Sequence, residues 1–316
     1  MKILLFHPVP LPPKDYGGVE RVVLWLATAL RDMGHEVWIG AREGSLLPAG
    51  LKLLPTPESE QSALDLLKRL PAGIEVVHFH APPEEGAIEA LPCASVLTIH
   101  GNGKAGEIFP SNTIFLSRDH ARRHGRSAFV YNGIDPSEFE FEGDWKRKKQ
   151  PLFLSKTTLR TKNLNYAMHV ARRARSGLTI AGGRRPLAAR MRSLAFGFDW
   201  AGPVAGTSKS RVLTGASCLL FPIRWEEPFG LVVMEALISG TPVIAAPRGA
   251  MSELVTPDVG ELIDLENEDR WVQAIREVRK FDPVRCRERV LKQFTNHHMA
   301  ENYISMYRKA IQGVPL

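Results

Sequence analysis

The sequence predicts an α/β protein built from two Rossmann-like domains, each with a doubly wound, mainly parallel sheet. Short apolar segments alternate with amphipathic segments of helical period in both halves of the chain. Such alternation indicates parallel strands joined by helices. The chain has 316 residues, which is long for one ordinary domain and suits two of about 150 residues. The polar stretch 138–150, which ends in four consecutive basic residues, is interpreted as the linker between them.

The first domain is expected over residues 1–145 and the second over residues 146–316. Strands of the first are predicted at Lys2–Phe6, Glu36–Gly40, Leu51–Pro55, Glu75–Phe79, Ser95–His100, Asn112–Leu116 and Ala128–Tyr131, and helices at Val19–Met33 and near Ser62–Leu70. Strands of the second are predicted at Pro151–Ser155, Leu178–Ala181, Cys218–Phe221, Pro242–Ala245 and Glu261–Ile263, and closing helical segments at Asp269–Phe281 and Arg285–Gln312. A return of the last helix, about residues 296–312, onto the first domain is left open.

Composition excludes several classes of protein. The chain is 44% hydrophobic and 24% charged, which is ordinary for a globular protein and unlike a disordered one. No run approaches the ~20 apolar residues that span a bilayer. The three cysteines lie far apart without a CxxC pair. A reducing cytoplasm therefore fits better than a disulfide framework.

The charge is divided unequally between the two halves. Residues 1–150 hold 17 Lys and Arg against 19 Asp and Glu, and residues 151–316 hold 24 against 15. The net charges are thus −2 and +9. A positive second half suits an anionic ligand such as a nucleotide diphosphate, although a solvated basic surface explains the charge about equally well.

Two other functional classes lack their sequence signatures. A nicotinamide oxidoreductase should carry GxGxxG at a strand-to-helix turn, followed by an acidic residue about 20 positions later. The glycines at 101, 103 and 106 match that spacing, but no clear helix start follows them. A nucleic-acid binder is suggested only by the isoelectric point of about 9.4, without a recognisable binding motif.

The most informative segment is FPIRWEEPFGLVVMEALISG at residues 221–240. It predicts a strand, a loop containing Glu227, and a helix that begins near Gly230. The first N–H groups of such a helix can bind an anion. Glu227 and Glu235 could accept hydrogen bonds from sugar hydroxyls. The alternative is that one is a helix-start charge and the other a solvated residue, with about even odds on the chemistry alone.

Glu227 and Glu235 are separated by seven residues, and this segment resembles the E-x7-E signature of retaining GT-B glycosyltransferases of family 4. The resemblance covers nearly the whole chain and includes further segments in the family's order. These are Gly17–Arg21, Leu30 with Gly34–Val37, Val77–His80, Thr98–Gly101 and Tyr131–Asp135. It implies GT-B architecture, in which two Rossmann-like domains face each other across a cleft. The first would serve the acceptor and the second the nucleotide sugar.

The resemblance also implies roles for individual residues. Glu235 would bind the ribose, and Glu227 would contact the transferred sugar together with the backbone of Phe229, Gly230 and Leu231. Gly18 would approach the donor diphosphate or the acceptor. His100 would face the reacting carbon, while a structural role is favoured for His78 and His80. Packing is the alternative for each histidine. His120 and His124 are spaced i, i+4 but lack a nearby carboxylate ligand, so no metal site is expected.

The predicted diphosphate clamp departs from the family pattern. Members usually carry Gly-Arg after the first strand of the second domain and a Lys a few residues later. Here Lys156 stands where Arg is usual, and Lys162 matches the second cation. Lys supplies charge without Arg's planar fork, and Arg160 could compensate. Solvated loop cations remain the alternative.

The function implied by the resemblance is transfer of a sugar from a nucleotide-diphosphate donor with retention of anomeric configuration. A UDP-sugar is favoured and GDP-mannose is the second choice. The acceptor would be a glycan, lipid or small molecule of cell-envelope or polysaccharide synthesis. The chain contains no Asp-x-Asp, so neither a metal nor another cofactor is expected.

Two questions stay open at this point. A catalytically silent nucleotide-sugar-binding protein would have the same fold. A peripheral membrane contact could use the basic cluster Arg118, Arg122, Arg123 and Arg126, although a solvated helix explains that cluster equally simply. No nucleic-acid partner is expected, and the oligomeric state is not predicted.

Overall fold

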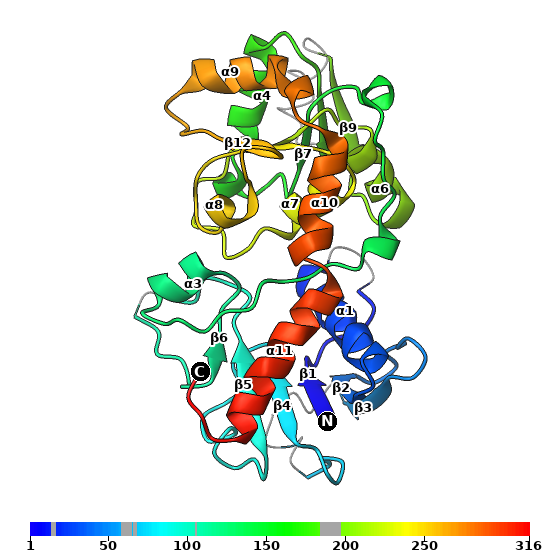
Figure 1. The fold of residues 1–316 in the computed structure, drawn as a ribbon, viewed down its shortest axis with the longest axis vertical. Helices are drawn as coiled ribbons and strands as arrows, with labels where there is room; N and C mark the ends of the chain where they lie inside the picture. Colours follow the sequence, from blue (N-terminus) through cyan, green and yellow to red (C-terminus); the bar gives the residue numbers. More distant parts are fainter. Residues whose placement is uncertain (14–16, 58–64, 66–67, 105, 184–196) are drawn as a thin grey trace. The chain divides into compact units, whose positions relative to one another are not determined.

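The computed structural model describes residues 1–13, 17–57, 65, 68–104, 106–183 and 197–316. The chain forms two compact units. Unit 1 contains Met1–Ile134 and Thr295–Leu316, and unit 2 contains Asp135–Phe294. Each is an α/β unit around one six-stranded parallel sheet (Figure 1).

The sheet of unit 1 has the strand order β3-β2-β1-β4-β5-β6, and every neighbouring pair is parallel. Its strands are β1 (Lys2–Phe6), β2 (Glu36–Arg42), β3 (Lys52–Thr56), β4 (Val76–Phe79), β5 (Ala94–Thr98) and β6 (Thr113–Ile114). The order reverses at β1, because the chain adds strands first on one side of it and then on the other. Ligands in open α/β sheets bind beyond the strand carboxyl ends near such a point.

Three described helices belong to unit 1: α1 (Gly18–Asp32), α3 (Arg118–Arg123) and α11 (Asn296–Ile311). Helix α11 contacts α1, β4 and β5, so the last turns of the chain complete the core of the first unit (Figure 1). Tyr303 and Tyr307 of α11 are fully buried there. Within the described part of the chain, every helix falls short of the length and apolarity needed to cross a bilayer.

The sheet of unit 2 has the strand order β12-β11-β10-β7-β8-β9, again all parallel. Its strands are β7 (Leu152–Leu154), β8 (Leu178–Ala181), β9 (Phe198–Gly202), β10 (Leu219–Phe221), β11 (Val243–Ala245) and β12 (Gly260–Leu262). The central strands are buried on both faces, which is why their sequences are continuously apolar.

The described helices of unit 2 surround this sheet. They are α4 (Leu164–Arg173), α6 (Gly206–Thr214), α7 (Leu231–Ile238), α8 (Met251–Leu254), α9 (Glu268–Arg276) and α10 (Pro283–Gln293), with 3₁₀ turns at η1 (Pro136–Glu138), η2 (Trp145–Arg147), η3 (Arg160–Lys162) and η4 (Val278–Lys280). Helix α10 packs on α7, and α4 packs on α9.

The predicted fold class is confirmed, with local differences. The expected strand Ala128–Tyr131 is a single parallel bridge between Phe115 and Phe129. Strand β9 was not expected, because its exposed edge position leaves an alternation of buried and exposed residues over a short stretch. The helix expected near Ser62–Leu70 falls mostly outside the described residues.

The expected helical stretch Arg285–Gln312 is two helices, α10 and α11. Thr295 separates them in an extended conformation, and its side chain accepts a hydrogen bond from the His298 N–H as an N-cap. The Asn296 N–H donates to the Ile134 carbonyl at 2.8 Å. A Cβ on Gly133 would lie 2.2 Å from the Thr295 carbonyl oxygen. Glycine is therefore needed where the two chain segments meet.

We expect Gly133→Ala to destabilise unit 1 by about 1–3 kcal/mol, because the added methyl forces backbone atoms apart in a packed region. Urea unfolding followed by circular dichroism measures the change. Gly101→Ala is the matched control, since a Cβ there has no atom within 4 Å, and it should change stability by less than about 0.5 kcal/mol. Equal effects in both variants would contradict the steric explanation.

Candidate active site

The loop between β10 and α7 turns sharply at Gly230. This residue is the N-cap of α7 and has φ +99°, in the left-handed region. A Cβ there would also meet the Met251 side chain at 2.8 Å. Glycine is required for both reasons, and the turn leaves the first N–H groups of α7, beginning at Leu231, at the carboxyl end of the sheet. Phe229 points into the core, where its ring lies 6.2 Å from that of Phe294.

A second loop, after β11, holds Glu227 in position. The Ala250 N–H donates to the Glu227 carbonyl at 2.9 Å, and the Gly249 N–H donates to Oε2 of Glu226 at 2.6 Å. A Cβ on Gly249 would lie 2.4 Å from the Glu227 nitrogen. The two loops are thus in direct backbone contact, so the Glu227 backbone cannot shift without moving Gly249 and Ala250 in the loop after β11.

The Glu227 carboxylate forms an ion pair with Lys162. Lys162 Nζ lies 2.6 Å from Glu227 Oε2, and Trp225 Nε1 donates to the same oxygen at 3.0 Å. The two charged side chains are only 15% and 11% exposed. The ammonium also lies over the Trp225 ring at 4.6 Å and the Phe221 ring at 5.3 Å, an arrangement that further stabilises a cation.

Lys162 reaches this position because the loop after β7 is anchored to the loop after β10. The Arg224 N–H donates to the Thr161 carbonyl at 2.8 Å. Asn163 then adopts a left-handed conformation, φ 61°, and α4 begins. Glu227 and Lys162, separated by 65 residues in sequence, are therefore brought together by adjacent strands.

Glu235 is buried, which excludes the alternative that it is a solvated surface residue. It lies in the second turn of α7 with 2% of its surface exposed. Its Oε1 is 2.5 Å from Nζ of Lys209, on α6, and Lys209 is buried too. A buried carboxylate needs such a counterion. Sequence reasoning missed Lys209, because nothing in its local pattern links it to a residue 26 positions away.

The predicted diphosphate-binding cations lie at the same end of the sheet. Lys156 is exposed in the loop after β7, and Arg160 is exposed at the start of η3. The adjacent loop after β8 packs closely on this one. Gly182 has φ +97°, and its Cβ would lie 2.5 Å from the Ser155 carbonyl oxygen. Lys156, Arg160 and Lys162 thus belong to one loop, after β7, which packs against the loops that follow the neighbouring strands β8 and β10.

Unit 1 carries a histidine cluster beyond the carboxyl ends of β1, β4 and β5. His80 Nδ1 and His100 Nε2 are 3.0 Å apart, and their rings stack at 5.3 Å. Burial, and secondarily the neighbouring His7 and His120, lowers the pKa of His100 to about 3. Burial also holds the pKa of His80 well below its usual value. Both rings are therefore neutral at pH 7.

His78 has a structural role. Its Nδ1 lies 2.7 Å from the Tyr307 hydroxyl and its Nε2 lies 2.7 Å from the Thr98 hydroxyl, which in turn contacts Tyr303. This buried network joins α11 to β4 and β5. His80, for which the sequence favoured a structural role, is also buried, and its Nδ1 lies within hydrogen-bond distance of His100 Nε2. Among the described residues, no group of three or more His, Cys, Asp or Glu is arranged to hold a metal ion.

Two remaining predicted features lie in unit 1. Gly18 is the first residue of α1, and Gly17 is its extended N-cap. Residues 14–16 lie outside the described residues.

The basic cluster on and after α3 is largely engaged in contacts within the protein. Arg122 and Arg123 pair with Asp119 at 2.9 and 2.7 Å, and Arg126 donates to the Phe109 carbonyl at 3.1 Å.

Comparisons with solved structures define the class of this fold. AviGT4, a glycosyltransferase involved in avilamycin A biosynthesis, superposes with a TM-score of 0.79 at 22% identity, over 99% of this chain and 98% of that one. HepE of Anabaena, solved in complex with UDP and glucose, superposes with a TM-score of 0.72 at 14% identity, over 98% and 99%. The architecture is therefore that of the GT-B glycosyltransferases.

The sequence matches identify the family. Residues 16–138 match the Glycosyltransferase Family 4 model, and residues 148–280 match the Glycosyl transferases group 1 model. The chain belongs to this family of nucleotide-sugar glycosyltransferases, as its E-x7-E segment predicted. Phosphatidyl-myo-inositol mannosyltransferase of Mycolicibacterium smegmatis is 25% identical, over 85% of this chain and 83% of that protein. An uncharacterized glycosyltransferase of Methanocaldococcus jannaschii is 24% identical over 58% of this chain, and the match spans about half of that relative, 54%.

The buried histidines predict that stability falls as pH falls. Burial lowers the pKa of His78, His80 and His100 in the folded state, whereas each titrates near 6.5 when unfolded. The unfolded chain therefore binds more protons below about pH 6.5. Stability should be full above that pH and should decline below it, by up to about 1.4 kcal/mol per pH unit for each histidine.

Urea unfolding at about pH 7 and about pH 5 measures this slope. His100→Gln should reduce the slope by up to one histidine's share. His297→Gln, which replaces an exposed histidine at the start of α11, is the control for the substitution itself. A slope in His100→Gln identical to that of the wild type would mean that His100 protonates freely in the folded protein.

Proposed function

We propose that this protein is a retaining glycosyltransferase that uses a UDP-sugar, with GDP-mannose as the second choice, and needs no metal ion. The acceptor would be a glycan, lipid or small molecule of cell-envelope or polysaccharide synthesis. One observation carries the proposal. In a member of this family, Lys162 and Glu227 meet at 2.6 Å beside the amino end of α7, so a cation, a carboxylate and the amino end of a helix lie at one edge of unit 2.

Each group matches one part of a nucleotide sugar. As the bond from the anomeric carbon to the diphosphate breaks, negative charge builds on the leaving diphosphate. Lys156, Arg160 and Lys162 would stabilise that charge together with the first N–H groups of α7. Such preorganised charge is often the largest catalytic contribution. Glu227 would accept hydrogen bonds from hydroxyls of the transferred sugar.

The Lys162–Glu227 pair keeps both charges compensated before a donor binds. A diphosphate would draw the Lys162 ammonium toward its oxygens, and a sugar hydroxyl would replace the ammonium at Glu227. Trp225 would stay on Oε2 and keep the carboxylate oriented. The pair would thus be exchanged for two contacts with the donor, and neither charge would be left alone in a site where the two side chains are only 15% and 11% exposed.

Glu235 and Lys209 would form the nucleotide end of the site. Lys209 compensates the buried carboxylate, so Glu235 stays in place to accept hydrogen bonds from the ribose hydroxyls. This role also keeps Glu235 from acting as a nucleophile. Retention would then come from attack on the face that the diphosphate leaves, with a donor phosphate oxygen accepting the acceptor's proton.

Unit 1 would supply the acceptor side. His100 would act there as a neutral hydrogen-bonding group, because its pKa of about 3 excludes a standing positive charge at pH 7. His80 would orient the ring through the 3.0 Å contact. Gly18, at the start of α1, would let a ligand approach the backbone closely.

The choice of donor is supported by relatives. HepE has been solved with UDP-glucose, and one relative is named a mannosyltransferase. Metal independence is supported by the three loop cations together with the missing Asp-x-Asp, since the cations would take the place of a metal on the diphosphate.

We expect UDP to raise the melting temperature of the protein with or without a chelator, and NAD to leave it unchanged. A ligand at 100 times its Kd stabilises by about 2.7 kcal/mol, which differential scanning fluorimetry detects. GDP is tested in parallel to rank the two bases. Stabilisation by NAD alone, or loss of the UDP effect with chelator, would contradict the proposal. Release of UDP from a UDP-sugar in the presence of acceptor distinguishes the enzyme from a silent binding protein.

The two glutamates should differ in what they bind. Glu235→Ala should weaken both UDP and the intact donor by about 1.5–3 kcal/mol, because a hydrogen-bonding charged group is lost. Glu227→Ala should reduce turnover without lowering the affinity for UDP. Once the carboxylate is removed, the Lys162 ammonium is still available to bind the phosphates of UDP. Calorimetric titration of each variant with UDP and with the intact UDP-sugar measures how each glutamate contributes to binding the nucleotide and the sugar.

Lys209→Met is the matched variant for the nucleotide end. It leaves the Glu235 carboxylate buried without its counterion, so it should weaken UDP as Glu235→Ala does and should also lower the melting temperature. If Glu227 and Glu235 were only a helix-start charge and a packing residue, both alanine variants would leave turnover intact. Equal loss of UDP affinity in both alanine variants would contradict the division of roles.

A further inference from the structure

Unit 2 has a basic pocket at the edge of its sheet opposite the donor-site residues. It has a volume of about 240 Å³. Its lining includes Lys149, Ser176 and Ser217, which lie two or three residues before the first residues of β7, β8 and β10. These three strands are neighbours in the sheet. Lys162 and Glu227 follow the carboxyl ends of β7 and β10, so the pocket lies at the amino ends of the same strands and is a separate site.

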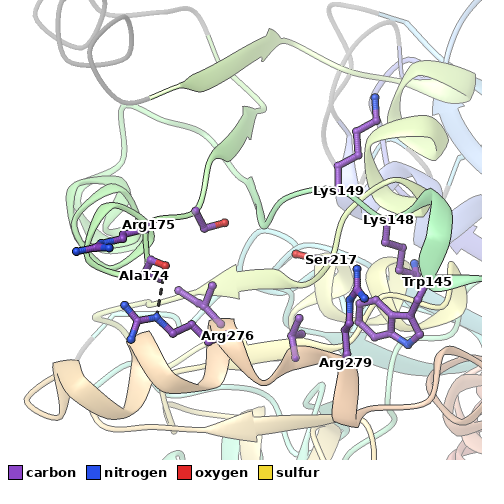
Figure 2. Close-up of a pocket in the computed structure, with 11 residues that line it drawn as sticks. Trp145, Lys148, Lys149, Ala174, Arg175, Ser217, Arg276 and Arg279 are labelled. Atoms are coloured by element: carbon purple, nitrogen blue, oxygen red, sulfur yellow. Dashed lines mark hydrogen bonds between the residues drawn. The ribbon is translucent and has the colours of Figure 1, made fainter.

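Five of the residues lining the pocket are cations, and none is acidic. The cations are Lys148, Lys149, Arg175, Arg276 and Arg279. Figure 2 shows Arg175 and Arg276 on one side of the pocket, Lys148 and Arg279 on the other, and Ser217 between the two sides. Like charges gathered around one hollow repel each other and create a strongly positive potential, which an anion would relieve.

Two of these cations donate hydrogen bonds to oxygens of the protein. Arg276 donates to the Arg173 and Ala174 carbonyls at 3.2 and 3.5 Å, so it caps the carboxyl end of α4. Lys148 is 6% exposed, and its ammonium donates to the Thr214 carbonyl and the Thr241 hydroxyl at 3.1 and 3.0 Å. No carboxylate in the described part of the chain pairs with this buried charge, and an unpaired buried charge is unfavourable.

Arg175 is a second, independent sign of function. It has φ +55°, at the position just beyond the carboxyl end of α4 that glycine usually occupies. An L side chain there is held in an unfavourable backbone conformation. Such strain clusters at functional sites, and here it places a guanidinium group in the lining of the pocket.

We propose that this pocket binds a phosphate-bearing anion. Three guanidinium groups and two ammonium groups suit phosphate oxygens, since guanidinium binds two of them at once, and Ser176 and Ser217 add hydroxyl donors. The volume is below the usual range of about 300–1,000 Å³ for pockets that enclose drug-sized ligands. The pocket thus has room for one or two phosphate groups rather than for a whole nucleotide sugar. A soluble phosphate compound and a lipid phosphate headgroup share this chemistry.

Calorimetric titration with inorganic phosphate and with pyrophosphate, at low ionic strength, tests the site. We expect Arg175→Gly and Arg279→Gln each to weaken pyrophosphate about tenfold, the lower end of the effect of losing a charged hydrogen-bond donor. Arg285→Gln, which removes an exposed cation of α10 outside the pocket, should leave the affinity unchanged. Arg175→Gly also relieves the backbone strain, so its urea midpoint should not fall, and loss of binding cannot be attributed to unfolding.

Lys162→Ala identifies binding at the donor site instead. Pyrophosphate affinity that survives Lys162→Ala and falls in the two pocket variants supports the proposal. Affinity that falls only in Lys162→Ala, or equal affinity in the pocket variants and Arg285→Gln, overturns it. Co-sedimentation with phosphatidylglycerol vesicles distinguishes the source. Vesicle binding that Arg279→Gln weakens, without binding of soluble phosphates, assigns the pocket to a lipid headgroup. These outcomes do not depend on UDP binding or sugar transfer.

Discussion

The arrangement of this protein depends on one constraint, the parallel pairing of all strands in each sheet. Parallel strands deliver every carboxyl end to the same edge, so the loops that follow β7, β8, β10 and β11 are neighbours whatever their distance in sequence. Those loops interlock through backbone hydrogen bonds and through glycines that leave no room for a side chain. Rigid loops of this kind can hold charged groups at fixed positions, which electrostatic catalysis requires.

Charge within unit 2 follows from that geometry. At the carboxyl edge, Lys162 pairs with Glu227 and Lys209 pairs with Glu235. In each pair one positive and one negative charge cancel, so these two lysines do not account for the excess positive charge of the second half of the sequence. At the amino edge, five cations line a pocket without a carboxylate. Three of these cations, Arg175, Arg276 and Arg279, belong to residues 151–316, so part of the net positive charge of that half lies at the pocket, away from Glu227 and Glu235.

The histidines of unit 1 show how burial changes the chemistry of a residue type. A histidine beyond a strand end suggests an acid–base group, because the imidazole usually titrates near neutral pH. Burial among other rings lowers the pKa of His100 to about 3, so that it is a hydrogen-bonding group instead. His78 belongs to a buried network with two tyrosines that attaches the last helix to the first sheet, and His80 connects this packing to His100.

The sequence by itself determined the fold class, most strand positions and the family. Buried parallel strands are continuous apolar runs, and E-x7-E with its glycines is a local pattern. The sequence could not reveal that Lys209 faces Glu235, that His80 contacts His100, or that five cations from three separate segments of the chain line one pocket. It also did not place the break at Thr295, where the neighbours that require it, Gly133 and Ile134, lie some 160 residues earlier. Local patterns record how each segment packs, but charge compensation and burial arise between segments, so only the tertiary structure decides them.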